Sequence, residues 1–186
     1  MLLRTGEDIY FHMTPLLRFA QAGDIPQIHA LVESAFRGDS AKRGWTHEAD
    51  LLGGQRTDPE ALAAIIADPA QCMLLAEAEG ALAGCVVVAD AGAGVAHLGM
   101  LTVDPALQGG GMGRVLLEAA EQHARGIGAA VMEMGVIAQR GELIAWYKRR
   151  GYAPTGREKP FPYDDPRFGE PKTGDLAFVV LAKALG

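Results

Sequence analysis

The sequence has few of the features that would place it in a membrane, outside the cell or on nucleic acid. No apolar run in its 186 residues approaches the roughly 20 residues that a membrane-spanning helix needs. The first dozen residues contain Glu7 and Asp8 and lack an apolar core, so we expect no signal peptide. The net charge is −6 without a long basic cluster, which argues against nucleic acid as a partner. The composition therefore predicts a soluble, cytoplasmic protein.

Cysteine and histidine are too sparse for a disulfide framework or a metal centre. The two cysteines, Cys72 and Cys85, lie in apolar runs of strand length. Two buried thiols in a cytoplasmic protein are the simplest interpretation. The five histidines show no HxxxH pair, so the sequence predicts no metal site.

The hydrophobic pattern predicts one α/β domain. Residues 1–13 are expected to be a poorly ordered leader, and residues 14–186 have the length of a single domain with one sizeable core. Strands and helices are expected in the order βααββ-β-αβ-αββ, which gives a mixed sheet with helices on both faces. Strands are expected at 16–20, 72–78, 82–90, 96–103, 130–137, 152–155 and 176–183, and helices after Asp24, after the Asp58-Pro59 cap, at 115–125 and at 142–150.

A glycine-rich segment, QGGGMGR, separates the strand 96–103 from the helix 115–125. Glycines let the backbone approach a ligand, and a helix that begins there points unpaired amides and its positive dipole end at the same place. The segment therefore predicts a site for phosphate or pyrophosphate. It fits neither GxGxxG nor the P-loop pattern, because Arg114 or Leu116 stands where glycine is needed. Its residues are Gln108, Gly109, Gly110, Gly111, Met112, Gly113 and Arg114.

The spacing Q-x-x-G-x-G in this segment resembles the GNAT superfamily of acyl-CoA-dependent N-acyltransferases. The likeness covers roughly residues 16–184 and is carried by LGMLTVDPALQGGGMGRVLLEAAE and LIAWYKRRGY. It implies a GNAT-type α/β (α+β) fold: a mixed, mostly antiparallel central sheet of about seven strands, four helices on both faces, and a splay between the fourth and fifth strands. It also implies acetyl-CoA as co-substrate, with its pyrophosphate on the glycine-rich segment and its pantetheine arm along Leu101, Thr102 and Val103. Arg114 would add a charged donor near the phosphates.

N-acyl transfer requires an uncharged amine and a proton for the departing thiolate. An alkylamine with a pKa of about 10.4 is neutral in only about one molecule in 2,500 at pH 7. The resemblance makes Tyr147 the general acid; the alternative is a packing tyrosine, and Trp146 is expected to be the core residue of the pair. His97 stands where histone-modifying relatives carry a catalytic glutamate, and strand alternation would place it on the face of Leu101. A packed histidine, Glu133 as base and a water relay stay open as alternatives.

Two connections are expected to bind the acceptor. The first contains Trp45 and Glu48, which could hold a cationic or polar group, unless the segment is only a short capped helix. The second contains Phe161 and Tyr163 among acidic residues, a mixture that suits an ammonium ion or a dimer contact. Arg140 stands where many relatives carry an asparagine near the pantetheine, and its role is open.

Together these features predict an N-acetyltransferase that transfers an acetyl group from acetyl-CoA to the primary amine of a small-molecule or amino-acid-like acceptor, by direct attack in a ternary complex. The alternatives are a non-catalytic acyl-CoA-binding sensor or interaction module, and a protein N-terminal or lysine acetyltransferase. Neither a membrane nor nucleic acid is expected as a partner, and the family likeness makes a homodimer plausible.

Overall fold

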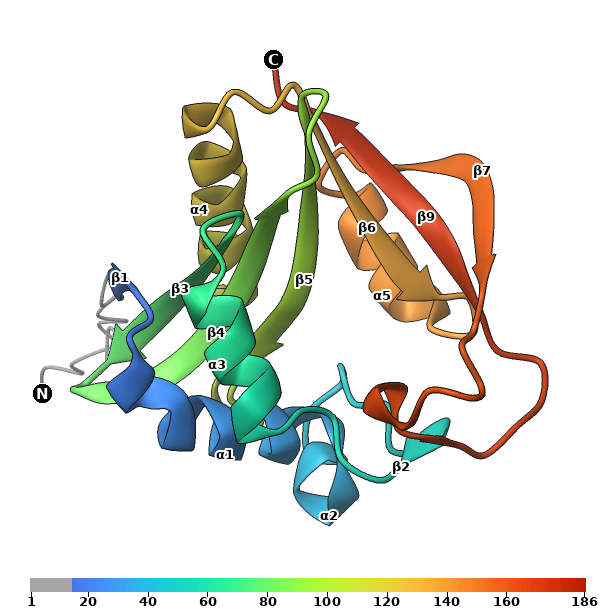
Figure 1. The fold of residues 1–186 in the computed structure, drawn as a ribbon. Helices are drawn as coiled ribbons and strands as arrows, with labels where there is room; N and C mark the ends of the chain where they lie inside the picture. The colour runs from blue at the N-terminus through green and yellow to red at the C-terminus, as the bar shows by residue number, and fades with distance from the viewer. Residues whose placement is uncertain (1–14) are drawn as a thin grey trace, which may run out of the picture.

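The computed structural model describes residues 15–186, so the expected leader at 1–13 lies outside the described residues. Within this part of the chain, no helix combines the length and the apolar character needed to cross a membrane. Figure 1 shows the arrangement of the elements. They are β1 (Leu16–Phe19), a 3-10 turn (Ala22–Asp24), α1 (Ile25–Phe36), α2 (Gly38–Ala41), β2 (Leu52–Gly53), α3 (Pro59–Ala67), β3 (Gln71–Ala78), β4 (Ala81–Asp90), β5 (Val95–Val103), a 3-10 turn (Pro105–Leu107), α4 (Met112–Gly126), β6 (Val131–Ile137), α5 (Gly141–Lys148), β7 (Ala153–Pro160), a 3-10 turn (Pro166–Phe168), β8 (Glu170–Pro171) and β9 (Ala177–Ala184).

The central sheet has seven strands in the order β1-β3-β4-β5-β6-β9-β7. Every neighbouring pair is antiparallel except β5 and β6, which run parallel. These two strands pair only at their beginnings, from Val95↔Val131 to His97↔Glu133, and then diverge towards their carboxyl ends (Figure 1). The mixed, mostly antiparallel sheet and its splay are confirmed.

Helices cover both faces of the sheet because each presents an apolar stripe to it. On one face, Leu116, Leu117, Ala120 and Ala124 of α4 recur at helical spacing and are buried against the strands. On the other face, the apolar side of α1 packs with Leu62 of α3 against β3 and β4. The carboxylate of Asp58 accepts the Ala61 amide at 2.7 Å and caps α3, as the Asp58-Pro59 pair predicted.

A bulge in β5 changes which residues face α4. Met100 has a φ of 50°, and the register with β4 shifts between Cys85 and Val87. As a result, Leu98 and Leu101 both contribute to the core beside α4, although they are three residues apart. The expectation that His97 shares a face with Leu101 is therefore wrong, because simple alternation stops at the bulge.

Two connections expected to be separate loops are joined in the fold. β2 pairs with β8 in a two-stranded sheet, with Leu52 opposite Pro171 and Gly53 opposite Glu170. A small apolar cluster of Leu52, Ile137, Phe161 and Leu176 lies between them and the main sheet. This unit, together with the one-turn helix α2 and the longer course of β7, was not predicted from the sequence pattern.

Candidate active site

A cavity of about 590 Å³ occupies the place where β5 and β6 separate. Because the strands no longer pair there, residues of both strands, of the glycine loop (residues 108–114) and of α5 form its walls. The segment between α2 and α3 closes another side. The lining includes Phe36, Trp45, Thr46, Glu48, Arg56, Leu98, Gly99, Met100, Leu101, Val103, Gln108, Gly109, Gly111, Met112, Gly113, Arg114, Met134, Gly135, Val136, Ile137, Arg140, Glu142, Trp146, Tyr147, Arg149, Arg150 and Phe178.

The glycine loop leaves open space beside its backbone. Gly109 and Gly111 have φ values of 89° and 91°, and a Cβ built on either residue would meet no atom within 4 Å. α4 begins immediately afterwards at Met112, so the amides of Met112 and Gly113 have no acceptor within the helix. Positive φ at Gly111 turns the chain into the helix at little steric cost. An anion can therefore approach the helix amino terminus closely.

Three arginines surround the same end of the cavity: Arg114, Arg149 and Arg150. The Arg150 guanidinium lies over the Trp146 ring, 3.5 Å from its centroid, and donates to the Trp146 carbonyl at 2.8 Å. Its Nε is buried without a hydrogen-bond partner among the described residues. Arg149 and Arg150 form a basic pair directly after AWYK in the sequence, and they were not predicted to belong to the site.

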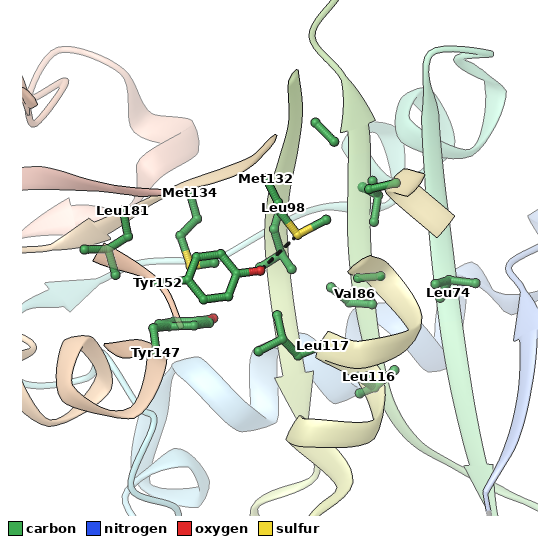
Figure 2. Packing of buried hydrophobic residues seen from close by; sticks show 14 of the residues in the cluster. Leu74, Val86, Leu98, Leu116, Leu117, Met132, Met134, Tyr147, Tyr152 and Leu181 are labelled. Atoms are coloured by element: carbon green, nitrogen blue, oxygen red, sulfur yellow. Dashed lines mark hydrogen bonds between the residues drawn. The ribbon is translucent and has the colours of Figure 1, made fainter. Parts of the chain in front are cut away.

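Tyr147 forms part of the cavity wall and is 5% exposed. Its ring makes edge contacts with Trp146 and Tyr152, at centroid distances of 5.0 Å and 5.7 Å. Figure 2 shows it below Met134 and Tyr152, between Leu181 and Leu117. Burial raises the pKa of Tyr147, although the positive charges of Arg140 and Arg150 oppose this. The phenol therefore stays protonated at neutral pH.

The expectation about which aromatic residue of α5 belongs to the core is wrong. Trp146 was expected to be the core residue, but Tyr147 is the more buried of the two and Trp146 is only partly buried. Both residues nevertheless line the cavity.

A buried carboxylate with three arginines stands where the segment between α2 and α3 closes the cavity. Glu48 is 8% exposed, and its two oxygens accept from Nη1 of Arg37 and Nη1 of Arg140, each at 2.9 Å. Arg56 approaches the same carboxylate at 3.8 Å. Burial alone would raise the pKa of Glu48, but Arg56, Arg140 and Arg37 together hold it below its ordinary value. Glu48 is thus ionised and already neutralised by its neighbours. We call these four residues the Glu48 cluster.

Arg140 connects α5 to the segment between α2 and β2. Besides binding Glu48, its Nη2 donates to the Thr46 carbonyl. Burial lowers the pKa of Arg140, and the nearby charge of Glu48 counters that effect. Its role, left open by the sequence, is to hold the Thr46–Glu48 backbone against the end of β6.

The side chain of Gln108 is bound to protein groups. Its Oε1 accepts the Trp45 amide at 2.9 Å, and its Nε2 donates to Thr46 Oγ1 at 2.9 Å and to the Val103 carbonyl at 3.2 Å. Trp45 lies beside Trp146, with ring centroids 6.4 Å apart. Gln108 therefore joins the glycine loop to the Trp45 segment on the opposite wall.

Several residues expected at the site lie elsewhere. His97 is half exposed and does not line the cavity; its Nε2 lies 3.8 Å from a Glu133 oxygen, and Glu133 also binds Arg157. Phe161 is buried behind the cavity wall in the cluster with Ile137, and the Tyr163 hydroxyl accepts the Leu176 amide at 2.7 Å. The acceptor wall expected from these two rings is therefore a packing and loop-fixing unit.

The three strand residues expected along the ligand differ in whether their side chains face the cavity. Leu101 and Val103 line the cavity. Thr102 is 1% exposed, and its hydroxyl donates to the Met100 carbonyl at 2.9 Å, so its side chain points away. Within residues 15–186, no group of three or more His, Cys, Asp or Glu side chains could hold a metal ion.

Residues 46–161, more than half of the chain, match the family described as the acetyltransferase (GNAT) domain. The chain therefore belongs to the GNAT acetyltransferase family. An IAA acetyltransferase from Azospirillum brasilense is 34% identical over 99 residues, which are 52% of this chain and 63% of that relative. The chain thus aligns with less than two thirds of that relative's length.

Solved structures share the fold over nearly the whole chain. The ribosomal-protein-S18-alanine N-acetyltransferase from Escherichia coli matches with a TM-score of 0.68 at 17% identity, over 93% of this chain and 95% of that chain. YncA from Salmonella typhimurium, solved with its cofactor acetyl-CoA, matches with a TM-score of 0.69 at 21% identity, over 94% and 95%. At these identities the likeness establishes the fold.

Proposed function

We propose that this chain is an N-acetyltransferase that moves the acetyl group of acetyl-CoA to the primary amine of a small acceptor by direct attack. The observation that carries the proposal is the position of the cavity. It lies in the splay of β5 and β6, with a helix amino terminus and three arginines at one end and the Tyr147 phenol in its wall.

The glycine loop and its arginines fit the diphosphate of coenzyme A. The amides of Met112 and Gly113 are free to donate, and open space lies beside Gly109 and Gly111. Arg114 and Arg150 add charged donors, which bind phosphate more strongly than neutral donors do. The carboxyl half of β5 has no partner strand on the β6 side beyond His97, so its backbone can pair with the amide-containing arm of the coenzyme.

Tyr147 serves as the general acid. Its raised pKa keeps the hydroxyl protonated, so it can donate to the sulfur as the carbon–sulfur bond breaks. The amine loses its own proton to a water relay, because His97 and Glu133 lie outside the cavity and Glu48 is held by arginines.

An acetyl-CoA assay over a panel of primary amines tests this function, with thiol release and the N-acetylated product both measured. Tyr147→Phe should lower kcat by about 100-fold, the lower part of the range for a general acid, and leave acetyl-CoA affinity near that of the wild type. Tyr163→Phe removes a hydroxyl outside the cavity and is the matched control. Unchanged kcat in Tyr147→Phe would remove this residue from the mechanism. Tight acetyl-CoA binding without product from any amine would favour a non-catalytic module.

A further inference from the structure

The side of the cavity closed by the segment between α2 and α3 carries an excess of positive charge. Arg37, Arg56 and Arg140 surround one buried carboxylate, Glu48. The other carboxylate in the cavity lining, Glu142, is exposed at the start of α5, where solvent screens its charge. A cationic acceptor group placed beside the Glu48 cluster would therefore meet net repulsion, whereas an anionic group would be attracted.

Among the three arginines of the Glu48 cluster, Arg56 lines the cavity and has guanidinium hydrogen-bond donors that bind no protein group in the described part of the chain. Both Nη atoms of Arg140 are already bound, to Glu48 and to the Thr46 carbonyl. Arg37 is buried and does not line the cavity. The Arg56 guanidinium lines the cavity, is 28% exposed, and has no side-chain hydrogen bond to any residue between 15 and 186.

The backbone and ring contacts of Arg56 hold it in place before any ligand binds. Glu33 of α1 accepts the backbone amides of Arg56 and Thr57 at 2.7 Å and 2.9 Å, so a carboxylate fixes the chain at this point. The guanidinium carbon lies 5.3 Å from the centroid of the Phe36 ring. A planar guanidinium fixed in this way is suited to two-point binding of a carboxylate.

We propose that the acceptor amine carries a carboxylate and that Arg56 binds this carboxylate through its free donors. The inference rests on the proposed acetyltransferase function and narrows its acceptor to amino-acid-like molecules. It also replaces the expectation that Glu48 attracts a cationic acceptor, since the charge of Glu48 is used within its own cluster. Arg56 then determines which acceptor binds, while Tyr147 acts on the leaving thiol.

Matched acceptor pairs test the inference with the full chain. Each pair consists of an amino acid and its carboxamide, which differ in charge and hardly in shape. Wild type should prefer the acid by about 10- to 100-fold in kcat/KM, the range that a charged hydrogen-bonding contact provides. Sulfonate and phosphonate analogues form a second set and show whether a planar carboxylate is required.

Variants at Arg56 assign the preference to this residue. Arg56→Gln should raise KM for the acid, leave kcat and acetyl-CoA affinity near their wild-type values, and abolish the preference over the amide; Arg56→Lys should restore part of it. Arg167 is an exposed arginine that pairs with Asp165 outside the cavity. The control Arg167→Gln should therefore change none of these values.

Failure of the carboxylate inference can be distinguished from failure of the proposed acetyltransferase function. Equal use of acid and amide by the wild type would overturn the carboxylate inference and leave the acetyltransferase proposal standing. An acid preference that survives in a folded Arg56→Gln protein would overturn the role of Arg56. If no amine is acetylated, binding of the same acid and amide in the presence of coenzyme A is measured by calorimetry; the absence of a preference there also overturns the inference.

Discussion

The glycine loop and the Glu48 cluster, two regions at the cavity, are built in different ways. The glycine loop is one contiguous segment whose main feature is free backbone, and Arg114 within it has an exposed side chain. The Glu48 cluster is made of side chains from three places in the chain, with Arg140 lying 92 positions from Glu48. A backbone site tolerates many side chains and binds one common ligand group, whereas a side-chain cluster can change with the acceptor. The difference is consistent with a shared coenzyme and a variable acceptor.

Removing the carboxylate of the Glu48 cluster should have the largest effect on stability. Glu48→Gln leaves three guanidinium groups close together with no counter-charge, and unpaired buried charge costs about 3–5 kcal/mol. Chemical denaturation at pH 7 measures the loss. The control is Glu118→Gln, because that exposed carboxylate pairs with Arg114 at 3.7 Å and should contribute less than about 1 kcal/mol. Equal losses in both variants would show that the cluster is no more than a surface ion pair.

A Cβ at Gly111 should damage the glycine loop. Gly111→Ala places a side chain on a residue with φ of 91° and into the space beside the loop, so both strain and obstruction are expected. Loss of one charged hydrogen bond to phosphate would weaken acetyl-CoA binding by at least about tenfold. Calorimetric titration with acetyl-CoA measures this.

Gly128→Ala is the control that separates backbone strain from obstruction of the space beside the glycine loop. Gly128 has a φ of 87° and also has open space around it, but it lies after α4, away from the cavity. Both variants should lose similar stability, and only Gly111→Ala should lose coenzyme affinity. A comparable loss of affinity in Gly128→Ala would mean that strain, and not proximity to the ligand, is responsible.

A smaller effect is expected in the pH dependence of the unfolding free energy, which also depends on the Glu48 cluster. The pKa of Glu48 lies below its ordinary value of 4.5 in the folded state, so its stabilising contribution is complete above pH 4.5 and is lost as the pH falls through the lowered value. The difference in unfolding free energy between wild type and Glu48→Gln should therefore narrow as the pH is lowered below 4.5. Other titrating groups cancel in this difference. A constant difference down to acid unfolding would contradict the lowered pKa.

Features set by neighbouring residues could be predicted from the sequence, and features set by distant ones could not. The glycine loop, the Asp58 cap and the order of most strands and helices along the chain follow from local spacing, and the family resemblance of one helical motif singled out Tyr147. The Glu48 cluster could not be predicted from the sequence, because Arg37, Arg56 and Arg140 come together only when the helices and β6 are packed. The bulge at Met100 escaped for a related reason: its left-handed φ and register shift arise from pairing with β4, which a period-two pattern cannot represent.

The Gln108 side chain limits how freely this protein can be re-engineered. Through one amide group, Gln108 at the start of the glycine loop binds the Trp45 backbone amide, the Thr46 hydroxyl and the Val103 carbonyl at the end of β5. Exchanging the segment around Trp45 for that of another family member would also release the anchor of the glycine loop. A graft intended to alter acceptor choice therefore has to preserve both contacts to Gln108, or coenzyme handling will change along with it.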